Sequence, residues 1–154
     1  MEQLCVKGYH VEVTELIDRL RARDWRVTPQ RRAVAEALAG THVHLTAEEV
    51  HAAARRVVPE VSLATVYNTL GELVAMGEVA ELRIGESNSV RYDPNTQTPH
   101  HHLVCRGCGL IFDVHPSGVD GLSLPRQERY GIQVRAVQVT FVGVCSNCAE
   151  TARA

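Results

Sequence analysis

The stretch VSLATVYNTLGELVAMGEV, residues 61–79, has the apolar spacing of an amphipathic helix together with signals for its start and its end. Ser62 is suited to cap the helix, because its hydroxyl can accept a hydrogen bond from an N–H group of the first turn. Gly77 readily adopts the left-handed conformation that ends many helices. We therefore predict a helix between these two residues.

Three shorter helices are predicted upstream of this one. The segment 14–25, TELIDRLRARDW, has a helical apolar face. The segment 28–40, TPQRRAVAEALAG, opens with a threonine cap and a proline in the first turn. In the segment 45–57, LTAEEVHAAARRV, Thr46 and Glu49 have the spacing of a capping box. Short helices joined by short loops indicate a helix-turn-helix.

The apolar period changes to two after Gly77. The segments VAELRI (79–84) and SVRYD (89–93) flank the turn GESN, which predicts a β-hairpin. A hairpin after the last helix makes residues 14–93 a winged-helix domain, preceded by an N-terminal arm at 1–13. Two prolines bracket PNTQTP (94–99), a predicted hinge. Residues 100–154 then have β character with one helix expected near 119–131, so the fold class is α+β.

Composition excludes several classes of protein. The chain has 154 residues, 45% of them hydrophobic and 22% charged, and no apolar run approaches the roughly 18 residues that span a bilayer. The N-terminus lacks a basic segment followed by an apolar one, so we expect a cytoplasmic protein without a membrane partner. The net charge is only −2, so binding to nucleic acid would depend on local features.

Four of the five cysteines form two pairs with two intervening residues each. Such pairs bind metal more often than they form disulfides in a reducing compartment, and two pairs complete a tetrahedral thiolate site of the structural Zn²⁺ type. Buried cysteines or a redox dithiol are the alternatives. The paired residues are Cys105, Cys108, Cys145 and Cys148, whereas Cys5 stands alone.

Histidines and aspartates form a second candidate group. His100 and His102 would share one face of a strand, with His101 on the other. Asp113 lies in a segment expected to pair with that strand, while Asp93 ends the wing and His44 lies between two helices. Three imidazoles and two carboxylates suit Fe(II), Mn(II) or Zn(II). Each histidine taken alone could equally be solvated or hydrogen-bonded within the fold.

The order of five motifs resembles that of the ferric-uptake-regulator family of dimeric, metal-dependent transcription repressors. The motifs are TPQRRAV, HLTAEEVH, VSLATVYNTLGEL, HHHLVCRGCG and VCSNC, and the resemblance covers roughly residues 14–149. It implies a DNA-binding winged helix, a small α/β dimerisation domain at 100–154 and structural zinc at the four paired cysteines. The implied partners are double-stranded operator DNA and a second copy of the chain, and no enzymatic activity is expected.

Within this family, the chain looks most like the peroxide-sensing branch. That branch has a regulatory Fe²⁺ or Mn²⁺ site whose pattern matches His44, Asp93, His100, His102 and Asp113. Iron- and zinc-sensing relatives more often have glutamate where this chain has Asp113. The resemblance implies that peroxide oxidises ligand histidines to 2-oxo-histidine, with His44 and His100 as candidates. His42 and His101 are left outside this site but remain candidates for an outlying metal ligand.

DNA contacts are expected from the helix at 62–77 and from nearby arginines. Short or flat side chains early in that helix could approach base edges, although its apolar residues are also compatible with a plain core helix. Arginines would contact phosphates. The expected DNA-binding residues are Ser62, Ala64, Thr65, Tyr67, Asn68, Arg19, Arg26 and Arg31.

Three alternatives remain open at this point. One is a zinc-, iron- or nickel-responsive uptake repressor of the same family. A second is a zinc-dependent hydrolase with an open site at His100, His102 and Asp113. A third is a zinc-containing protein-interaction module.

Overall fold

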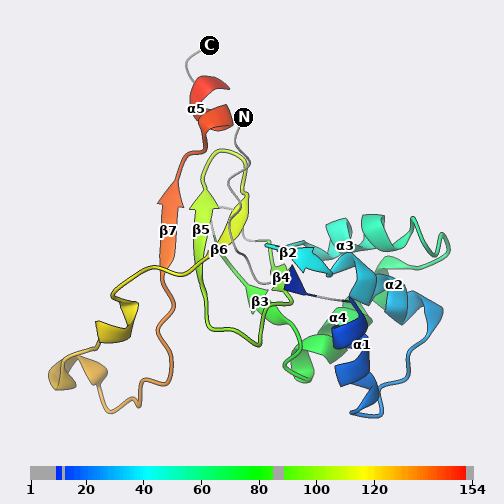
Figure 1. The fold of residues 1–154 in the computed structure, drawn as a ribbon, viewed down its shortest axis with the longest axis horizontal. Helices are drawn as coiled ribbons and strands as arrows, with labels where there is room; N and C mark the ends of the chain where they lie inside the picture. Colours follow the sequence, from blue (N-terminus) through cyan, green and yellow to red (C-terminus); the bar gives the residue numbers. More distant parts are fainter. Residues whose placement is uncertain (1–9, 12, 85–88, 152–154) are drawn as a thin grey trace. The chain divides into compact units, whose positions relative to one another are not determined.

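The computed structural model describes residues 10–11, 13–84 and 89–151. These residues form two compact units, Met1–Pro99 and His100–Ala154 (Figure 1). The division follows Pro99, where the predicted hinge at 94–99 ends. Most of the predicted N-terminal arm and the tip of the predicted wing lie outside the described residues. No helix in the described ranges is long and apolar enough to cross a membrane.

The described part of the first unit contains four α-helices, as the sequence predicts. They are α1 (Val13–Arg21), α2 (Pro29–Ala37), α3 (Ala47–Ala54) and α4 (Leu63–Ala75). Their apolar faces meet in one core, to which Leu20, Val34, Val50 and Leu70 contribute fully buried side chains. Burial of these faces is the main source of stability for helices this short.

The helix starts follow the predicted capping. Thr28 accepts a hydrogen bond from the backbone of Arg31, and Ser62 accepts one from the backbone of Thr65. The capping box at α3 is complete, because Thr46 and Glu49 each accept from the backbone of the other. These bonds pair N–H groups that a helix cannot satisfy internally.

Two short antiparallel pairs accompany these helices. Strand β3 (Ala80–Leu82) pairs with β4 (Arg91–Asp93), which confirms the predicted wing hairpin. Strand β1 (His10–Val11) pairs with β2 (Gly40–Thr41), a contact that the sequence analysis missed. Tyr92 on β4 is buried in the helical core, and its backbone pairs with Leu45. Strand β4 of the wing therefore packs against the segment that precedes α3.

The second unit has a sheet in the strand order β6-β5-β7. Strand β5 (His101–Cys105) runs antiparallel to β6 (Ile111–Val114) and parallel to β7 (Thr140–Gly143). The helix α5 (Ser146–Thr151) follows β7. A parallel neighbour requires a crossover, and residues 115–139 supply it.

The prediction of a helix near 119–131 is wrong. This segment contains only two short 3-10 turns, η1 (Val119–Gly121) and η2 (Arg126–Arg129). Pro125 cannot donate to a helical backbone, and Tyr130 and Gly131 both have positive φ. The β character expected from residue 132 onward is confined to β7, because residues 132–139 pair with no strand in the part of the chain that the structure describes.

Candidate metal centres and nucleic-acid interface

The four paired cysteines converge at one end of the second unit. Cys105 ends β5 and Cys108 lies in the turn after it, while Cys145 follows β7 and Cys148 lies in α5. The parallel pairing of β5 with β7 sets Cys105 beside Gly143 and so brings the two pairs together. The four sulfur atoms all lie within 4.8 Å of one another. This arrangement has the chemistry of a tetrahedral zinc site.

A tight turn shapes this thiolate site. Gly109, with φ 71°, donates its N–H to the carbonyl oxygen of Cys105 at 2.9 Å. A Cβ atom added at Gly107 would lie only 2.6 Å from the Cβ and the Sγ of Cys148. Glycine at 107 is therefore needed for the two cysteine segments to approach each other.

Hydrogen bonds shift the pKa values of these thiols in opposite directions. The pKa of Cys105 is lowered to about 6, chiefly because the backbone N–H of Cys145 donates to its sulfur at 3.3 Å. The pKa of Cys148 is raised to about 12, chiefly by its hydrogen bond with the side chain of Cys145. Four adjacent thiols cannot all ionise without a cation, so zinc binding at this site releases protons.

The first unit contributes one histidine and one aspartate that face each other. The antiparallel bridge between Leu45 and Tyr92 places His44 opposite Asp93. The Nε2 atom of His44 lies 3.9 Å from Oδ2 of Asp93, and both residues are buried. The other carboxylate oxygen, Oδ1, accepts a hydrogen bond of 2.8 Å from the backbone N–H of Asn95. This bond orients the carboxylate with Oδ2 toward the imidazole.

The second unit contributes two histidines and one aspartate on one face of its sheet. His102 pairs directly with Asp113 across β5 and β6. The Nε2 atom of His100 lies 3.2 Å from Nε2 of His102 and 3.9 Å from Oδ1 of Asp113. His102 and Asp113 are both buried. The predicted alternation along this strand is thus confirmed, and each unit separately presents imidazole and carboxylate donors without a thiolate.

His101 has a different task from its two neighbours. Its Nδ1 atom accepts a hydrogen bond of 3.2 Å from the backbone N–H of Val139. The backbone N–H of His102 donates to the carbonyl oxygen of Val139 at 3.1 Å. His101 therefore helps to align the chain entering β7 with β5. His42 has a positive φ of 55° in the loop before α3, and His115 is exposed after β6.

Helix α4 has one face in the core and one face in solvent. Val66, Leu70 and Leu73 are buried, whereas Tyr67 and Asn68 are exposed. The expected DNA-reading residues Ser62 and Ala64 are also exposed, and Thr65 is half-buried. The helix is therefore a core element that leaves a polar face exposed to solvent.

Tyr67 on that face contacts Glu48, which lies on the neighbouring helix α3. The hydroxyl of Tyr67 donates to Oε1 of Glu48 at 2.8 Å. The pKa of Glu48 is lowered, first by a hydrogen bond from its own backbone N–H and then by Tyr67, and the pKa of Tyr67 is raised by the same bond to Glu48. The contact spans 19 positions of sequence, so no local pattern could have revealed it.

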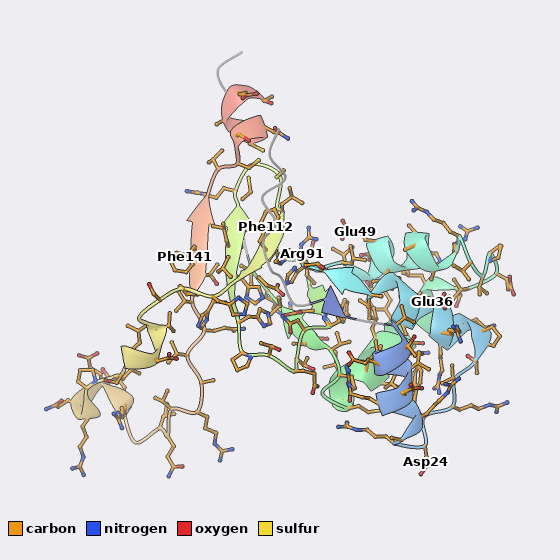
Figure 2. All side chains as sticks on the ribbon, viewed as in Figure 1. Asp24, Glu36, Glu49, Arg91, Phe112 and Phe141 are labelled. Atoms are coloured by element: carbon orange, nitrogen blue, oxygen red, sulfur yellow. The ribbon has the colours of Figure 1, made fainter. Side chains whose placement is uncertain are left out.

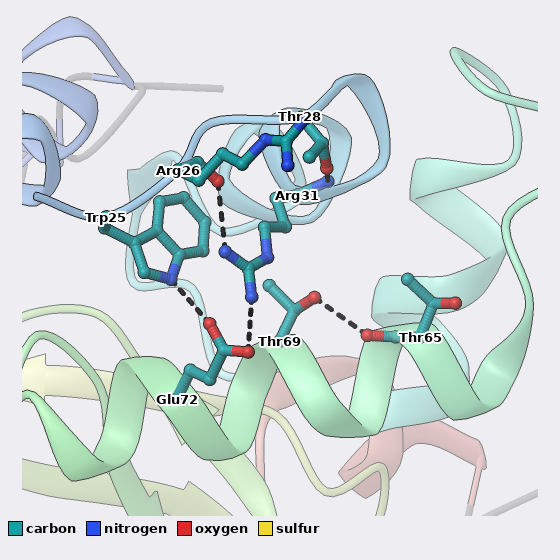
Figure 3. A network of polar contacts seen from close by, with 7 residues as sticks. All are labelled: Trp25, Arg26, Thr28, Arg31, Thr65, Thr69 and Glu72. Atoms are coloured by element: carbon teal, nitrogen blue, oxygen red, sulfur yellow. Dashed lines mark hydrogen bonds and ion pairs between the residues drawn. The ribbon is translucent and has the colours of Figure 1, made fainter.

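Two of the three arginines expected to bind phosphate are engaged within the protein. The Nε atom of Arg19 donates to Oε2 of the buried Glu78 at 2.8 Å. Arg31 donates to Glu72, which also accepts from the indole N–H of Trp25 at 2.7 Å (Figure 3). The guanidinium of Arg31 lies 4.9 Å from the centre of the Trp25 ring, a cation–π geometry. Arg26 is exposed.

A winged helix joined to a unit with four clustered thiols defines a metal-binding, DNA-binding regulator. The chain belongs to the ferric uptake regulator family, whose model matches residues 22–142. Membership confirms a transcription regulator rather than an enzyme, which removes the hydrolase alternative.

Similar proteins of known name include peroxide-responsive repressors. The Staphylococcus epidermidis peroxide-responsive repressor PerR is 37% identical over 139 residues, which cover 90% of this chain and 91% of that protein. The structure of PerR from Streptococcus pyogenes has a TM-score of 0.50 at 28% identity, covering 93% of this chain and 97% of that one. The Helicobacter pylori ferric uptake regulator Fur, at 20% identity, shares the fold with a TM-score of 0.71 and coverages of 92% and 97%.

Replacing Glu72 by alanine should destabilise the first unit, because Trp25 and Arg31 would both lose their carboxylate partner. The expected loss is about 1 kcal/mol in the free energy of unfolding, measured by urea titration. Trp25 is the only tryptophan, so its emission should shift to the red as water replaces the carboxylate.

Glu36→Ala is the matched control for this prediction. Glu36 pairs with Arg32 one turn away on α2, where Arg32 is exposed, so the expected change is below about 0.5 kcal/mol. Equal losses for the two variants would contradict a special role for Glu72.

Replacing Cys105 by serine should abolish stoichiometric zinc binding and cooperative unfolding of the second unit. Zinc content by atomic emission and thermal unfolding provide the measurements, with Cys5→Ser as the control that should retain both. Full zinc occupancy in the Cys105 variant would contradict a four-thiolate site.

Proposed function

We propose that this chain is a metal-dependent transcription repressor that senses hydrogen peroxide and derepresses oxidative-stress genes. The observation that carries the proposal is a pair of buried donor groups without thiolates, one in each unit, separate from the four-cysteine site. Similarity to peroxide-responsive repressors over nine-tenths of the chain supports the same function. The protein acts in the cytoplasm on double-stranded operator DNA.

The cysteines and the histidine–aspartate groups hold different metals. Four thiolates suit a closed structural Zn²⁺ site. Imidazoles and carboxylates suit Fe²⁺ or Mn²⁺, and the proposed regulatory ligands are His44, Asp93, His100, His102 and Asp113. Strand pairing sets His44 opposite Asp93 in the first unit and His102 opposite Asp113 in the second, so each unit offers donors that suit a divalent ion.

Ligands drawn from both units couple metal binding to DNA binding. His44 and Asp93 belong to the winged-helix unit, and the other three belong to the sheet unit. When all five hold one ion, they favour one arrangement of the units over others. If that arrangement places two recognition helices at successive major-groove half-sites, metal affinity and DNA affinity are linked.

A second copy of the chain covers the other face of the sheet. Leu103 pairs with Phe112 on one side and Phe141 on the other, which forms an apolar row across the three strands. These side chains are between 39% and 43% exposed, and Phe112 and Phe141 are labelled in Figure 2. Alternation along the strands puts this row opposite His102 and Asp113. Dimerisation through the row would leave the metal ligands of each copy intact.

Sensing follows from oxidation of a ligand imidazole. When bound, Fe(II) would pass one electron to hydrogen peroxide beside the ligands and recover it from the imidazole under attack, so the two electrons that peroxide takes up come from the histidine ring. His44 or His100 gains one oxygen atom on its ring and becomes 2-oxo-histidine, while the second oxygen of the peroxide leaves as water. The oxidised ring no longer donates its lone pair in the same geometry, so the two units lose their shared ligand set. With Mn(II), which reacts far less with peroxide, the protein represses without sensing.

Peroxide should release the Fe(II)-loaded dimer from operator DNA and leave the Mn(II)-loaded dimer bound. The measurements are anaerobic gel shifts before and after peroxide, followed by peptide mass spectrometry. Peptides that contain His44 or His100 should gain the mass of one oxygen atom only in the Fe(II) sample. Retained DNA binding without this gain would instead support a metal-uptake repressor of the same family.

His102→Ala should keep zinc and the dimer but lose DNA binding that depends on Mn(II) or Fe(II). The substitution removes a proposed regulatory ligand and leaves all four thiolates. Zinc content, sedimentation and gel shifts with and without Mn(II) test this, and Cys105→Ser is expected to differ from His102→Ala by losing zinc and the dimer. Loss of zinc from the His102 variant would show that the two metal sites are not separate.

A further inference from the structure

The side chain of Arg91 lies beside His44, a proposed metal ligand of the first unit, without being a proposed ligand itself. Arg91 and Asp93 are two positions apart on β4, so their side chains leave the same face of the strand, whereas Tyr92 enters the core. Arg91 is labelled in Figure 2 together with Glu49 of α3. It is one-fifth exposed, with its guanidinium turned toward the protein.

One nitrogen of this guanidinium joins two places in the chain. Its Nη1 atom donates to the carbonyl oxygen of His44 at 2.8 Å and to Oε2 of Glu49 at 3.2 Å. The same oxygen of Glu49 accepts the backbone N–H of Thr46 at 2.8 Å. Hydrogen bonds to ionised groups are stronger than neutral ones.

Three successive residues before α3 are held in this way. The carbonyl oxygen of His44 is bound by Arg91, that of Leu45 accepts from the backbone N–H of Tyr92 at 2.8 Å, and the N–H of Thr46 is bound by Glu49. Arg91 makes one of these three contacts and Glu49 another, and the two side chains are joined by their ion pair. The backbone that orients the His44 ring toward Asp93 is thus fixed from both sides.

We propose that Arg91 is a positioning residue for the regulatory metal, acting through the backbone of His44. The proposal rests on the function proposed above. A ligand that is already ordered loses less conformational freedom when it binds an ion, so loss of Arg91 weakens metal binding. Outer-shell partners of metal ligands typically alter affinity by about 10- to 100-fold.

The positive charge of Arg91, taken alone, predicts the opposite change in metal affinity when the residue is replaced. The two effects can therefore be told apart by experiment. A cation near the site repels a divalent ion, so removal of its charge alone would tighten metal binding. Positioning predicts weaker binding. Arg83, an exposed arginine on the segment after β3, offers a matched loss of one positive charge on the same hairpin.

The experiment titrates Mn(II) into the zinc-loaded, full-length protein under anaerobic conditions and follows free Mn(II) by electron paramagnetic resonance. We expect Arg91→Ala to bind Mn(II) at least about 10-fold more weakly than the unmodified protein. Arg91→Lys keeps the charge and one donor group and should recover part of the affinity. Arg83→Ala should stay within about twofold, and zinc content should be equal in all samples.

Glu49→Gln provides a second variant that does not alter the arginine. Glutamine can still cap α3, so the helix start is retained while the ion pair to Arg91 is lost. It should also weaken Mn(II) binding, by less than Arg91→Ala, with an unchanged urea midpoint for the Mn(II)-free protein.

Three results would overturn the proposal. One is an affinity of Arg91→Ala equal to or tighter than that of the unmodified protein. Another is an equal loss in Arg83→Ala. The third is an Arg91→Lys variant as weak as Arg91→Ala. If the unmodified zinc-loaded protein binds no Mn(II) at all, the proposed function fails as well. If the unmodified protein and Arg91→Ala bind Mn(II) equally well, only the positioning role of Arg91 is removed.

Discussion

Hydrogen-bonded pairing of β5 with its two neighbours places every proposed metal ligand of the second unit except His100, which directly precedes the strand. The antiparallel partner β6 sets Asp113 beside His102, and the parallel partner β7 carries the second cysteine pair to the first. Because successive side chains of a strand point to opposite faces, the same strand also presents Leu103 away from the ligands. One register therefore separates an apolar face from a face of metal donors, and a slip by one residue would exchange them.

In the first unit, several arginines form ion pairs within the protein. Arg19 and Arg31 are expected from the sequence to contact DNA phosphates, yet each is bound to a carboxylate of the helical unit. Glu78 is buried and its charge is compensated by Arg19 and Arg23. A buried carboxylate without such partners would be strongly destabilising. These ion pairs hold α4 and the chain after it against the earlier helices.

Several features were predictable because their signals are local. The caps at Thr28, Thr46 and Ser62 use hydrogen bonds within three residues, and the wing follows from a change of period beside Gly77. The alternation of His100 and His102 around His101 also follows from strand geometry alone. The helix expected at 119–131 failed because Pro125 and the left-handed residues Tyr130 and Gly131 outweigh its apolar spacing.

The sequence by itself determined the types of ligand, the pairs of cysteines and the order of the four helices and the wing hairpin in the first unit, since each depends on spacing within a few residues. Tertiary structure alone decided which arginines remain exposed, how Glu48 holds Tyr67 and how Arg91 holds the backbone of His44. It also joined cysteine pairs 40 positions apart through a parallel pairing of strands. Contacts of this kind leave no periodic trace in a sequence, because packing of the whole unit, rather than any neighbouring residue, selects the partner.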